Sequence, residues 1–179
     1  NTNVVIGCLN SDNETVKQFR MVTDLKKTDD EYASGMKMIL HHNGVDCSQF
    51  EGAIICSVVP PLTDIFRRAI EEITGLKALV VGAGIKTGLN ILIEDPASLG
   101  SDLVAAAVAA IAQFPLPVIV IDMGTATTIS VIDRNKNFIG GVIMPGLRIS
   151  AESLSSRTSQ LPQVSLDPPK KAIGRNTID

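Results

Sequence analysis

The sequence predicts an α/β fold of two related halves, each opening with a β-hairpin. Two observations support this prediction. Short apolar stretches typical of strands alternate with amphipathic stretches typical of helices along the 179 residues. Residues 125–133 also repeat the design of residues 1–9, in which small polar residues lead into a strand, a polar turn and a returning strand. We therefore expect an N-terminal half over residues 1–116 and the start of a C-terminal half over residues 117–179.

The composition limits the kinds of partner. With 45% hydrophobic and 20% charged residues, the chain has an ordinary globular composition. A net charge of -3 without a basic block, and few aromatic residues, argue against nucleic acid as a partner. The longest apolar stretch, residues 103–114, is too short to span a bilayer. We expect a soluble, cytoplasmic protein without a membrane partner.

The cysteines and histidines show no metal-binding pattern. Cys8, Cys47 and Cys56 are odd in number and lack C-x-x-C spacing, so free buried thiols are expected instead of a metal site or a disulfide framework. His41 and His42 close a helical pattern and are expected to face solvent.

The first elements follow from local signals. Residues 4–9 and 15–22 predict two strands of a hairpin joined by a turn at residues 10–13. Thr28 and Glu31 have the spacing of a capping box. They predict a helix ending near residues 43–44, with an apolar stripe of Tyr32, Met36, Ile39 and Leu40.

The rest of the first half alternates strands and helices. Residues 52–59 predict a strand that Pro60 and Pro61 stop, and residues 62–74 predict an amphipathic helix that ends at Gly75. A strand at residues 78–81 and a glycine-containing loop at residues 82–88 follow, and then a helix at residues 97–114. The loop is not a P-loop, because Ile85 stands where glycine must precede the lysine.

The second half opens with the stretch that holds the clearest candidate functional residues. A buried strand at residues 118–122 delivers the carboxylate of Asp122 to a turn containing Gly124 and Thr125. A carboxylate for a cation, glycine for close backbone approach and threonine hydroxyls indicate a turn that handles phosphate. An ordinary hairpin rich in β-branched residues is the alternative. A strand at residues 137–143 and a helix at residues 149–159 complete the pattern.

Both ends of the chain look incomplete. The chain starts at Asn1 almost within a strand, and if the halves correspond, a counterpart of Asp122 and Gly124 should precede Asn1. We expect truncation at both termini.

Two halves of this kind resemble the actin-like (ribonuclease H-like) ATPases and sugar kinases, whose nucleotide lies in the cleft between the halves. A doubly wound nucleotide-binding sheet is disfavoured, because a tight turn and not a helix joins the first two strands. Segments along the whole chain resemble one family in that superfamily, the type III pantothenate kinases. The matching segments are residues 1–3, 23–24 with 28–32, 57–61, 84–91, 122–128, 140–141 with 145–146, and 174 with 176–177.

The resemblance implies a homodimeric enzyme that phosphorylates pantothenate with ATP, the first step of coenzyme A biosynthesis. It also implies a divalent metal such as magnesium, and a monovalent cation, potassium or ammonium, held by Asp122. The implied contacts to ATP and its phosphates are Asn1, Thr2, Asn3, Gly124 and Thr125. The implied substrate contacts are Ile93, Gly100, Ser101, Asp102, Leu103 and Thr177.

Asp102 occupies the position of the family's catalytic base, in Gly100-Ser101-Asp102-Leu103 where the family has Gly-Ala-Asp-Arg. A carboxylate can accept the proton of a primary hydroxyl during phosphoryl transfer. The structural alternative is an acidic residue placed at a helix N-terminus by the helix dipole.

The chain departs from the family on the substrate side. Leu103 replaces an arginine suited to a substrate carboxylate, Ala106 replaces an asparagine, and Ile93 replaces a tyrosine. Two further hypotheses follow from these positions: a catalytically weak, nucleotide-binding accessory or regulatory protein, and a related kinase with another small hydroxyl substrate.

Overall fold

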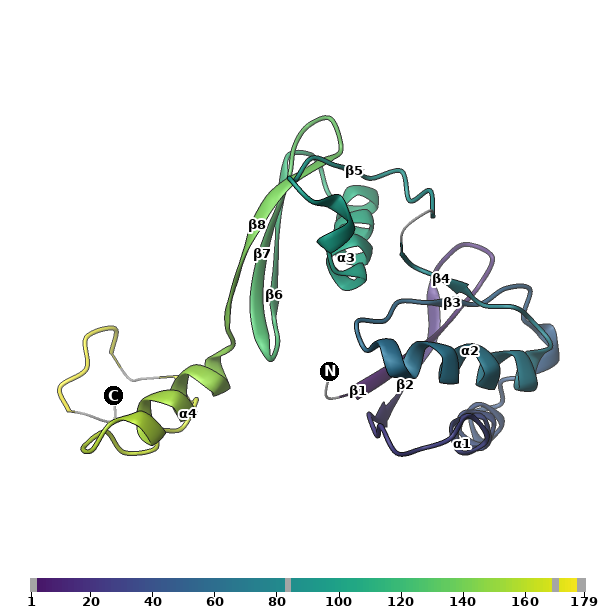
Figure 1. Ribbon diagram of the computed structural model, residues 1–179, viewed down its shortest axis with the longest axis horizontal. Helices are drawn as coiled ribbons and strands as arrows, with labels where there is room; N and C mark the ends of the chain where they lie inside the picture. Colours follow the sequence, from purple (N-terminus) through teal and green to yellow (C-terminus); the bar gives the residue numbers. More distant parts are fainter. Residues whose placement is uncertain (1–2, 83–84, 169–170, 177–179) are drawn as a thin grey trace. The chain divides into compact units, whose positions relative to one another are not determined.

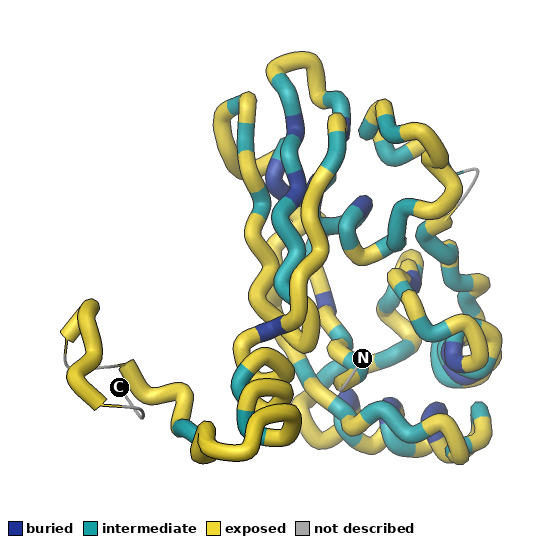
Figure 2. The backbone as a smooth tube through the Cα atoms, turned by 60° about the vertical axis from the view of Figure 1, so that its left-hand side comes forward, coloured by how far each residue is buried: buried dark blue, intermediate teal, exposed yellow. Residues whose placement is uncertain are grey.

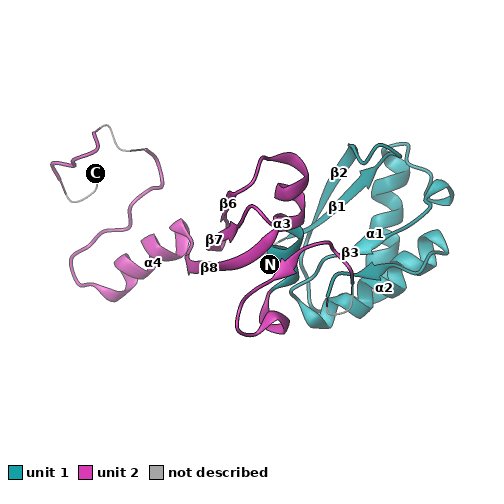
Figure 3. Ribbon diagram, turned by 90° about the horizontal axis from the view of Figure 1, so that it is seen from above, with its two compact units in different colours: residues 1–85, 100–105 teal, residues 86–99, 106–179 magenta. Residues whose placement is uncertain are grey.

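The protein is a mixed α/β molecule, and its computed structural model describes residues 3–82, 85–168 and 171–176. The chain divides into two compact units, coloured separately in Figure 3. Unit 1 comprises Asn1–Ile85 with Gly100–Ala105, and unit 2 comprises Lys86–Leu99 with Ala106–Asp179. These units group residues by proximity, and the predicted division between residues 116 and 117 stays a prediction.

Unit 1 opens with the predicted hairpin. Strands β1 (Asn3–Leu9) and β2 (Thr15–Val22) pair antiparallel, as Figure 1 shows. In the turn between them, the side-chain oxygen of Asn10 accepts hydrogen bonds from the backbone N–H groups of Asp12 and Glu14, at 3.1 and 2.9 Å. The turn is closed by Asn13, which has a positive φ of 61° and is a residue type that tolerates this conformation.

Helix α1 (Asp29–His42) begins at the predicted capping box. The Thr28 hydroxyl accepts from the Glu31 N–H at 3.3 Å, and the Glu31 carboxylate accepts from the Thr28 N–H at 2.8 Å. Tyr32, Met36 and Leu40 are buried, which confirms most of the predicted stripe. The helix ends at Asn43, as expected, and the short 3-10 helix η1 (Cys47–Gln49) follows.

The segment over residues 54–80 differs from the prediction in where its strands and its helix begin and end. Pro60 and Pro61 are the first residues of helix α2 (Pro60–Thr74), where their missing N–H groups leave no helical hydrogen bond unmade. The strand before them is correspondingly short, because β3 (Ile54–Ile55) pairs with β4 (Leu79–Val80) in parallel over two residues only. Gly75 ends α2 with φ 72°.

One hydrophobic core holds unit 1 together. Its buried residues come from α1, β3 and α2: Tyr32, Ala33, Met36, Ile55, Leu62, Phe66 and Ala69. The centroids of the Tyr32 and Phe66 rings lie 4.5 Å apart, and the rings are tilted relative to each other, as aromatic pairs prefer. The Tyr32 hydroxyl donates to the carbonyl of Asp24 at 3.0 Å, so its polar end is satisfied within this core.

Unit 2 contains a sheet in the order β5-β8-β7-β6. Its strands are β5 (Asn90–Ile91), β6 (Val118–Met123), β7 (Ala126–Ile132) and β8 (Asn137–Pro145). β6, β7 and β8 lie where strands were predicted and form an antiparallel meander, whereas β5 adds in parallel to β8 and was not predicted. No residue of β6 is buried, contrary to the expectation of a buried strand at residues 118–122. Ala107, Ile132 and Phe138 form its core, and the buried positions are dark blue in Figure 2.

Two helices begin at other residues than predicted: one starts later in the chain and the other starts earlier. The expected helix at residues 97–114 is divided, since Pro96–Ser98 form the 3-10 helix η2 and α3 covers Ser101–Gln113. The extended backbone of Leu99, with φ -68° and ψ 122°, separates them. Helix α4 (Leu147–Arg157) begins directly after Gly146 and contains no buried residue.

The turn between β7 and β8 has the same hydrogen-bond scheme as the first hairpin turn. The Asp133 carboxylate accepts from the N–H groups of Asn135 and Asn137 at 2.8 and 2.9 Å, and Lys136 has a φ of 63°. The hydrogen bonds from Asn137 hold the pKa of Asp133 below its ordinary value. The internal similarity seen in the sequence therefore extends to the geometry of both turns.

The cysteines of the described residues are free, as predicted, but only Cys8 is buried; Cys56 is exposed, contrary to the expectation of buried thiols. Burial raises the pKa of the Cys8 thiol. His41 and His42 are exposed, as expected. Within the described residues, every helix is too short or too polar to cross a membrane.

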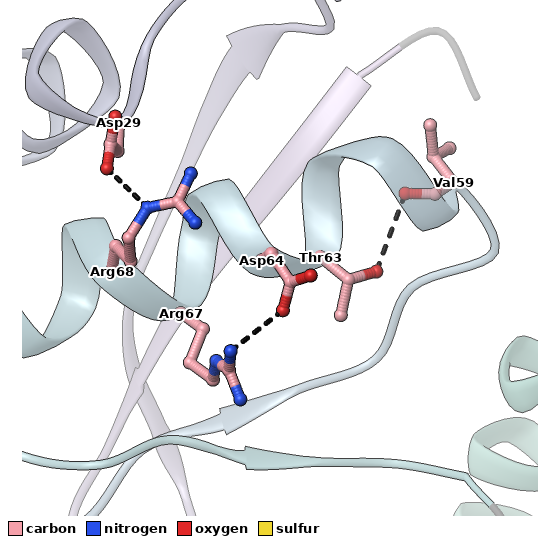
Figure 4. Close-up of polar contacts among 6 residues, drawn as sticks. All are labelled: Asp29, Val59, Thr63, Asp64, Arg67 and Arg68. Carbon is pink, nitrogen blue, oxygen red and sulfur yellow. Dashed lines mark hydrogen bonds and ion pairs between the residues drawn. The ribbon is translucent and has the colours of Figure 1, made fainter.

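We expect Asp29→Asn to lower the melting temperature at neutral pH. The Asp29 carboxylate accepts a hydrogen bond from Arg68 of α2 and so links α1 to α2 (Figure 4). This hydrogen bond holds the pKa of Asp29 below its ordinary value. The stabilisation is therefore complete above the unfolded-state pKa of about 3.9 and is lost as the pH falls through the lower folded-state value.

Thermal unfolding of both proteins from pH 7 down to about pH 3 tests this prediction. The melting-temperature difference should shrink below about pH 4. The control is Asp64→Asn, because Asp64 pairs with Arg67 within a single helix at 3.0 Å, and both side chains are more than half exposed. A difference for Asp29→Asn that stays constant with pH would contradict the assignment.

Candidate functional site

The turn between β6 and β7 gathers three predicted site residues at one end of the sheet of unit 2. Asp122 lies near the end of β6 and is paired in register with Thr128 of β7. The Gly124 N–H donates to the carbonyl of Ala126 at 3.0 Å, which closes the turn. Asp122, Gly124 and Thr125 are all exposed. A carboxylate and a threonine hydroxyl are thus accessible to a ligand beside a glycine turn.

Gly146 supports this turn from the end of β8. Its N–H donates to the carbonyl of Thr125 at 2.9 Å. A Cβ atom at position 146 would overlap the carbonyl oxygen of Gly124 and would lie 2.6 Å from that of Thr125. Sequence reasoning did not assign Gly146 a role in the site, although Pro145-Gly146 belongs to the segments that resemble the family.

The first turn of α3 presents the predicted base. The Asp102 side chain is exposed, and its Oδ1 accepts from the N–H of Leu103 at 2.9 Å. Its Oδ2 accepts no hydrogen bond from the part of the chain that the structure describes, so it is accessible to a substrate proton. A Cβ atom at Gly100 would lie 2.5 Å from Asp102 Oδ1, so glycine leaves room for the carboxylate.

Ser101 and the three substituted positions have defined environments. The Ser101 hydroxyl donates to the carbonyl of Ser57 at 2.8 Å, within unit 1. Leu103 and Ala106 are half-buried on α3. Ile93 packs against the buried cluster of unit 2, so an apolar residue at this position contributes to the core.

The first hairpin contributes only one described site residue. Asn3 is exposed at the start of β1, whereas Asn1 and Thr2, the other predicted contacts before the hairpin, lie outside the described residues. The predicted substrate contact Thr177, near the other end of the chain, also lies outside them. Asn3 also lines a cavity of about 950 Å³ in unit 1, whose walls are mainly apolar side chains of β1, β3 and α2. Thr23 lines the same cavity, and its buried hydroxyl has no hydrogen-bond partner within the described residues.

The described residues contain no group of three or more His, Cys, Asp and Glu side chains that could hold a metal ion. Asp122 and Thr128 offer oxygen donors, the ligand type that hard cations prefer. Magnesium in kinases commonly uses one or two carboxylates together with substrate phosphates. The donor chemistry of Asp122 therefore fits a cation that is bound with a nucleotide.

Comparison with solved structures supports the fold. A protein from Campylobacter jejuni, described as a "conserved putative Baf family transcriptional activator", matches with a TM-score of 0.52 and 21% sequence identity. The match covers 91% of this chain and 63% of that chain, so this chain spans less than two thirds of that protein's length. At this identity the likeness concerns the fold alone.

Comparison with protein families identifies the family of this chain. The family model of the type III pantothenate kinases matches residues 1–179, which is the whole chain. The residues that match include the β6–β7 turn and the first turn of α3 described above. The chain belongs to the type III pantothenate kinase family.

Proposed function

We propose that the protein phosphorylates pantothenate with ATP to give 4'-phosphopantothenate, the first step of coenzyme A biosynthesis. The observation that carries this proposal is the exposed carboxylate of Asp102, with one oxygen left free, in a chain of this family. The same proposal includes two related actin-like halves, and the matching turns at Asn10 and Asp133 support that relationship. We also propose that the protein is a homodimer and acts in the cytoplasm.

In the proposed reaction, the substrate hydroxyl oxygen attacks the terminal phosphorus of ATP. The new oxygen–phosphorus bond forms as the bond to the bridging oxygen of ADP breaks, and the hydroxyl proton passes to Asp102. Asp102 suits this role because its free oxygen is exposed and the other oxygen is already hydrogen-bonded to the Leu103 N–H. The protein then releases ADP, the phosphorylated product and the proton.

The β6–β7 turn is proposed to bind the phosphates of ATP. Gly124 and Thr125 are exposed there, so the backbone of Gly124 and the side-chain hydroxyl of Thr125 can closely approach a phosphate. Asp122 is proposed to hold the monovalent cation, potassium or ammonium, whose charge offsets the phosphates. A divalent ion, magnesium, would supply further charge neutralisation when bound with ATP. From the first hairpin, Asn1, Thr2 and Asn3 are proposed to contact the nucleotide.

On the substrate side, the chain departs from the residues that the family resemblance implies. Leu103 cannot form the paired hydrogen bonds that arginine makes with a carboxylate, and the half-buried Ala106 carries no hydrogen-bonding side chain. Gly100, Ser101, Ile93 and Thr177 remain proposed contacts of the substrate. These positions motivate the alternatives of a nucleotide-binding accessory protein and of a kinase for another small hydroxyl compound.

Pantothenate-dependent release of ADP tests the proposal. The protein, expressed from its complete coding sequence, is assayed with magnesium and ATP in potassium buffer, with and without pantothenate. We expect ADP release only when pantothenate is present, and slower release when sodium replaces potassium. ATP binding without pantothenate-dependent turnover would reject the proposal and favour the accessory protein, whereas turnover with a different hydroxyl acceptor would favour the related kinase.

A further inference from the structure

The cavity in unit 1 has the size and the lining of a site for a small molecule. Its volume of about 950 Å³ lies within the range of roughly 300–1,000 Å³ that is typical of such sites. All the residues that line it belong to unit 1. Its walls are mainly apolar and include Ile6 of β1, Met36 of α1 and Phe66 of α2. An apolar molecule in this cavity would contact side chains of the core of unit 1.

The hydroxyl of Thr23 is a polar atom buried in this apolar wall. Thr23 follows β2 directly, and its hydroxyl makes no hydrogen bond to any residue that the structure describes. Burial of an unpaired hydroxyl costs free energy, and a hydrogen bond from a ligand would offset this cost. A buried water molecule typically needs about three polar partners, which mainly apolar walls do not supply. The position of Thr23 therefore favours a ligand that has one polar group.

The other polar side chains of the wall differ from Thr23. Some of them, such as Asn3 and Gln49, are exposed, so water can reach them. Thr74 also lines the cavity, but its hydroxyl already donates to the carbonyl of Ile70 at 2.7 Å. Thr23 is consequently where a polar atom of a ligand would gain most.

The charge of the wall favours a neutral ligand. Among the lining residues that the structure describes there is no lysine, arginine or histidine, whereas Glu51 contributes a carboxylate. A ligand carboxylate or phosphate would lose its hydration in the cavity without gaining a cationic partner. A ligand hydroxyl is uncharged at neutral pH, and it can donate to the Thr23 oxygen or accept from it.

We infer that the cavity of unit 1 binds a neutral aliphatic molecule whose single hydroxyl group forms a hydrogen bond with the hydroxyl of Thr23. This inference goes beyond the proposed function. Of the described residues that the proposed function assigns to ATP or to the substrate, Asn3 alone lines the cavity. The binding site is thus distinct from Asp102 and from the β6–β7 turn.

Isothermal titration with 1-octanol tests the inference on the protein expressed from its complete coding sequence. We expect one saturable site, with an affinity that rises about fourfold for each CH₂ group added from 1-hexanol to 1-octanol. Octanoate should bind at least about tenfold more weakly, because its carboxylate finds no cation in the wall. An absence of saturable octanol binding, or tighter binding of octanoate, would overturn the inference.

The variant Thr23→Val removes the hydroxyl and keeps nearly the same side-chain shape. We expect it to weaken octanol binding about fivefold and to raise the melting temperature of the ligand-free protein, since an unpaired buried hydroxyl is removed. Thr74→Val is the matched control, because Thr74 lines the same cavity and its hydroxyl is already hydrogen-bonded. Unchanged octanol affinity in Thr23→Val, or an equal loss in Thr74→Val, would contradict the assignment of Thr23.

Two measurements on the wild-type protein need no variant to fold. At saturation with 1-octanol, we expect a nuclear Overhauser effect between the ligand protons next to the hydroxyl and the methyl group of Thr23, and its absence would reject the inferred contact. Excess ATP should leave the octanol affinity unchanged; displacement by ATP would assign the cavity to the nucleotide site instead. Neither measurement depends on turnover, so failure of the proposed kinase activity and failure of this inference are distinguishable.

Discussion

Asp102→Asn is expected to abolish pantothenate-dependent ADP release, with a fall in kcat of about a hundredfold or more. Asparagine has nearly the same shape as aspartate, and its side-chain oxygen can still accept the hydrogen bond from the Leu103 N–H that Asp102 accepts at 2.9 Å. The amide cannot take up the proton of the substrate hydroxyl. The variant thus removes the proposed chemistry and leaves the local geometry in place.

Steady-state kinetics and ATP binding measured on the same protein preparations separate chemistry from binding. We expect an unchanged Kd for ATP and an unchanged melting temperature. The control is Asp95→Asn, since Asp95 is an exposed carboxylate that caps the neighbouring η2 and accepts from the Ala97 N–H at 3.2 Å, which asparagine can also do. Undiminished kcat for Asp102→Asn would show that Asp102 is not the base.

Gly146→Ala is expected to weaken ATP binding about tenfold and to destabilise the protein by about 1–3 kcal/mol. A Cβ at this position would overlap the carbonyl oxygen of Gly124 and lie 2.9 Å from the carbonyl carbon of Thr125. These are backbone atoms of the β6–β7 turn, so relief of the overlap must move the turn itself. The backbone of Gly146 has an ordinary φ of -68°, so the effect comes from space and not from conformation.

Isothermal titration with ATP and denaturant unfolding measure the two effects. Gly52→Ala is a suitable control, because no atom lies within 4 Å of a Cβ built on Gly52. A Gly146→Ala protein that is destabilised but binds ATP with unchanged affinity would show that the turn is structural and does not bind the phosphates.

The elements that could be predicted are those whose signals are local. The capping box of Thr28 and Glu31 lies within a single helical turn, and its hydrogen bonds join residues three apart. The turn at Asn10 likewise uses hydrogen bonds between residues two and four apart. Such contacts depend only on neighbouring residues, so the sequence pattern contains all the participants.

The boundaries that were misplaced depend on choices that local signals leave open. Two prolines can end a strand or begin a helix, and packing of Leu62 and Phe66 into the core favours the helix. The strand β5 is only two residues long and exists because it pairs with β8, about 47 residues later. No periodicity over two residues could indicate that pairing.

The candidate site likewise contains residues that the sequence could predict and contacts that only the structure reveals. Residue types and spacing alone singled out Asp122, Gly124 and Thr125. The family resemblance, which the family model confirms, added Asp102. Spacing along a chain cannot reveal which distant atoms meet, because contacts between remote segments depend on how the whole core packs. Only the tertiary structure could therefore place Gly146 against the β6–β7 turn and the Ser101 hydroxyl on the carbonyl of Ser57.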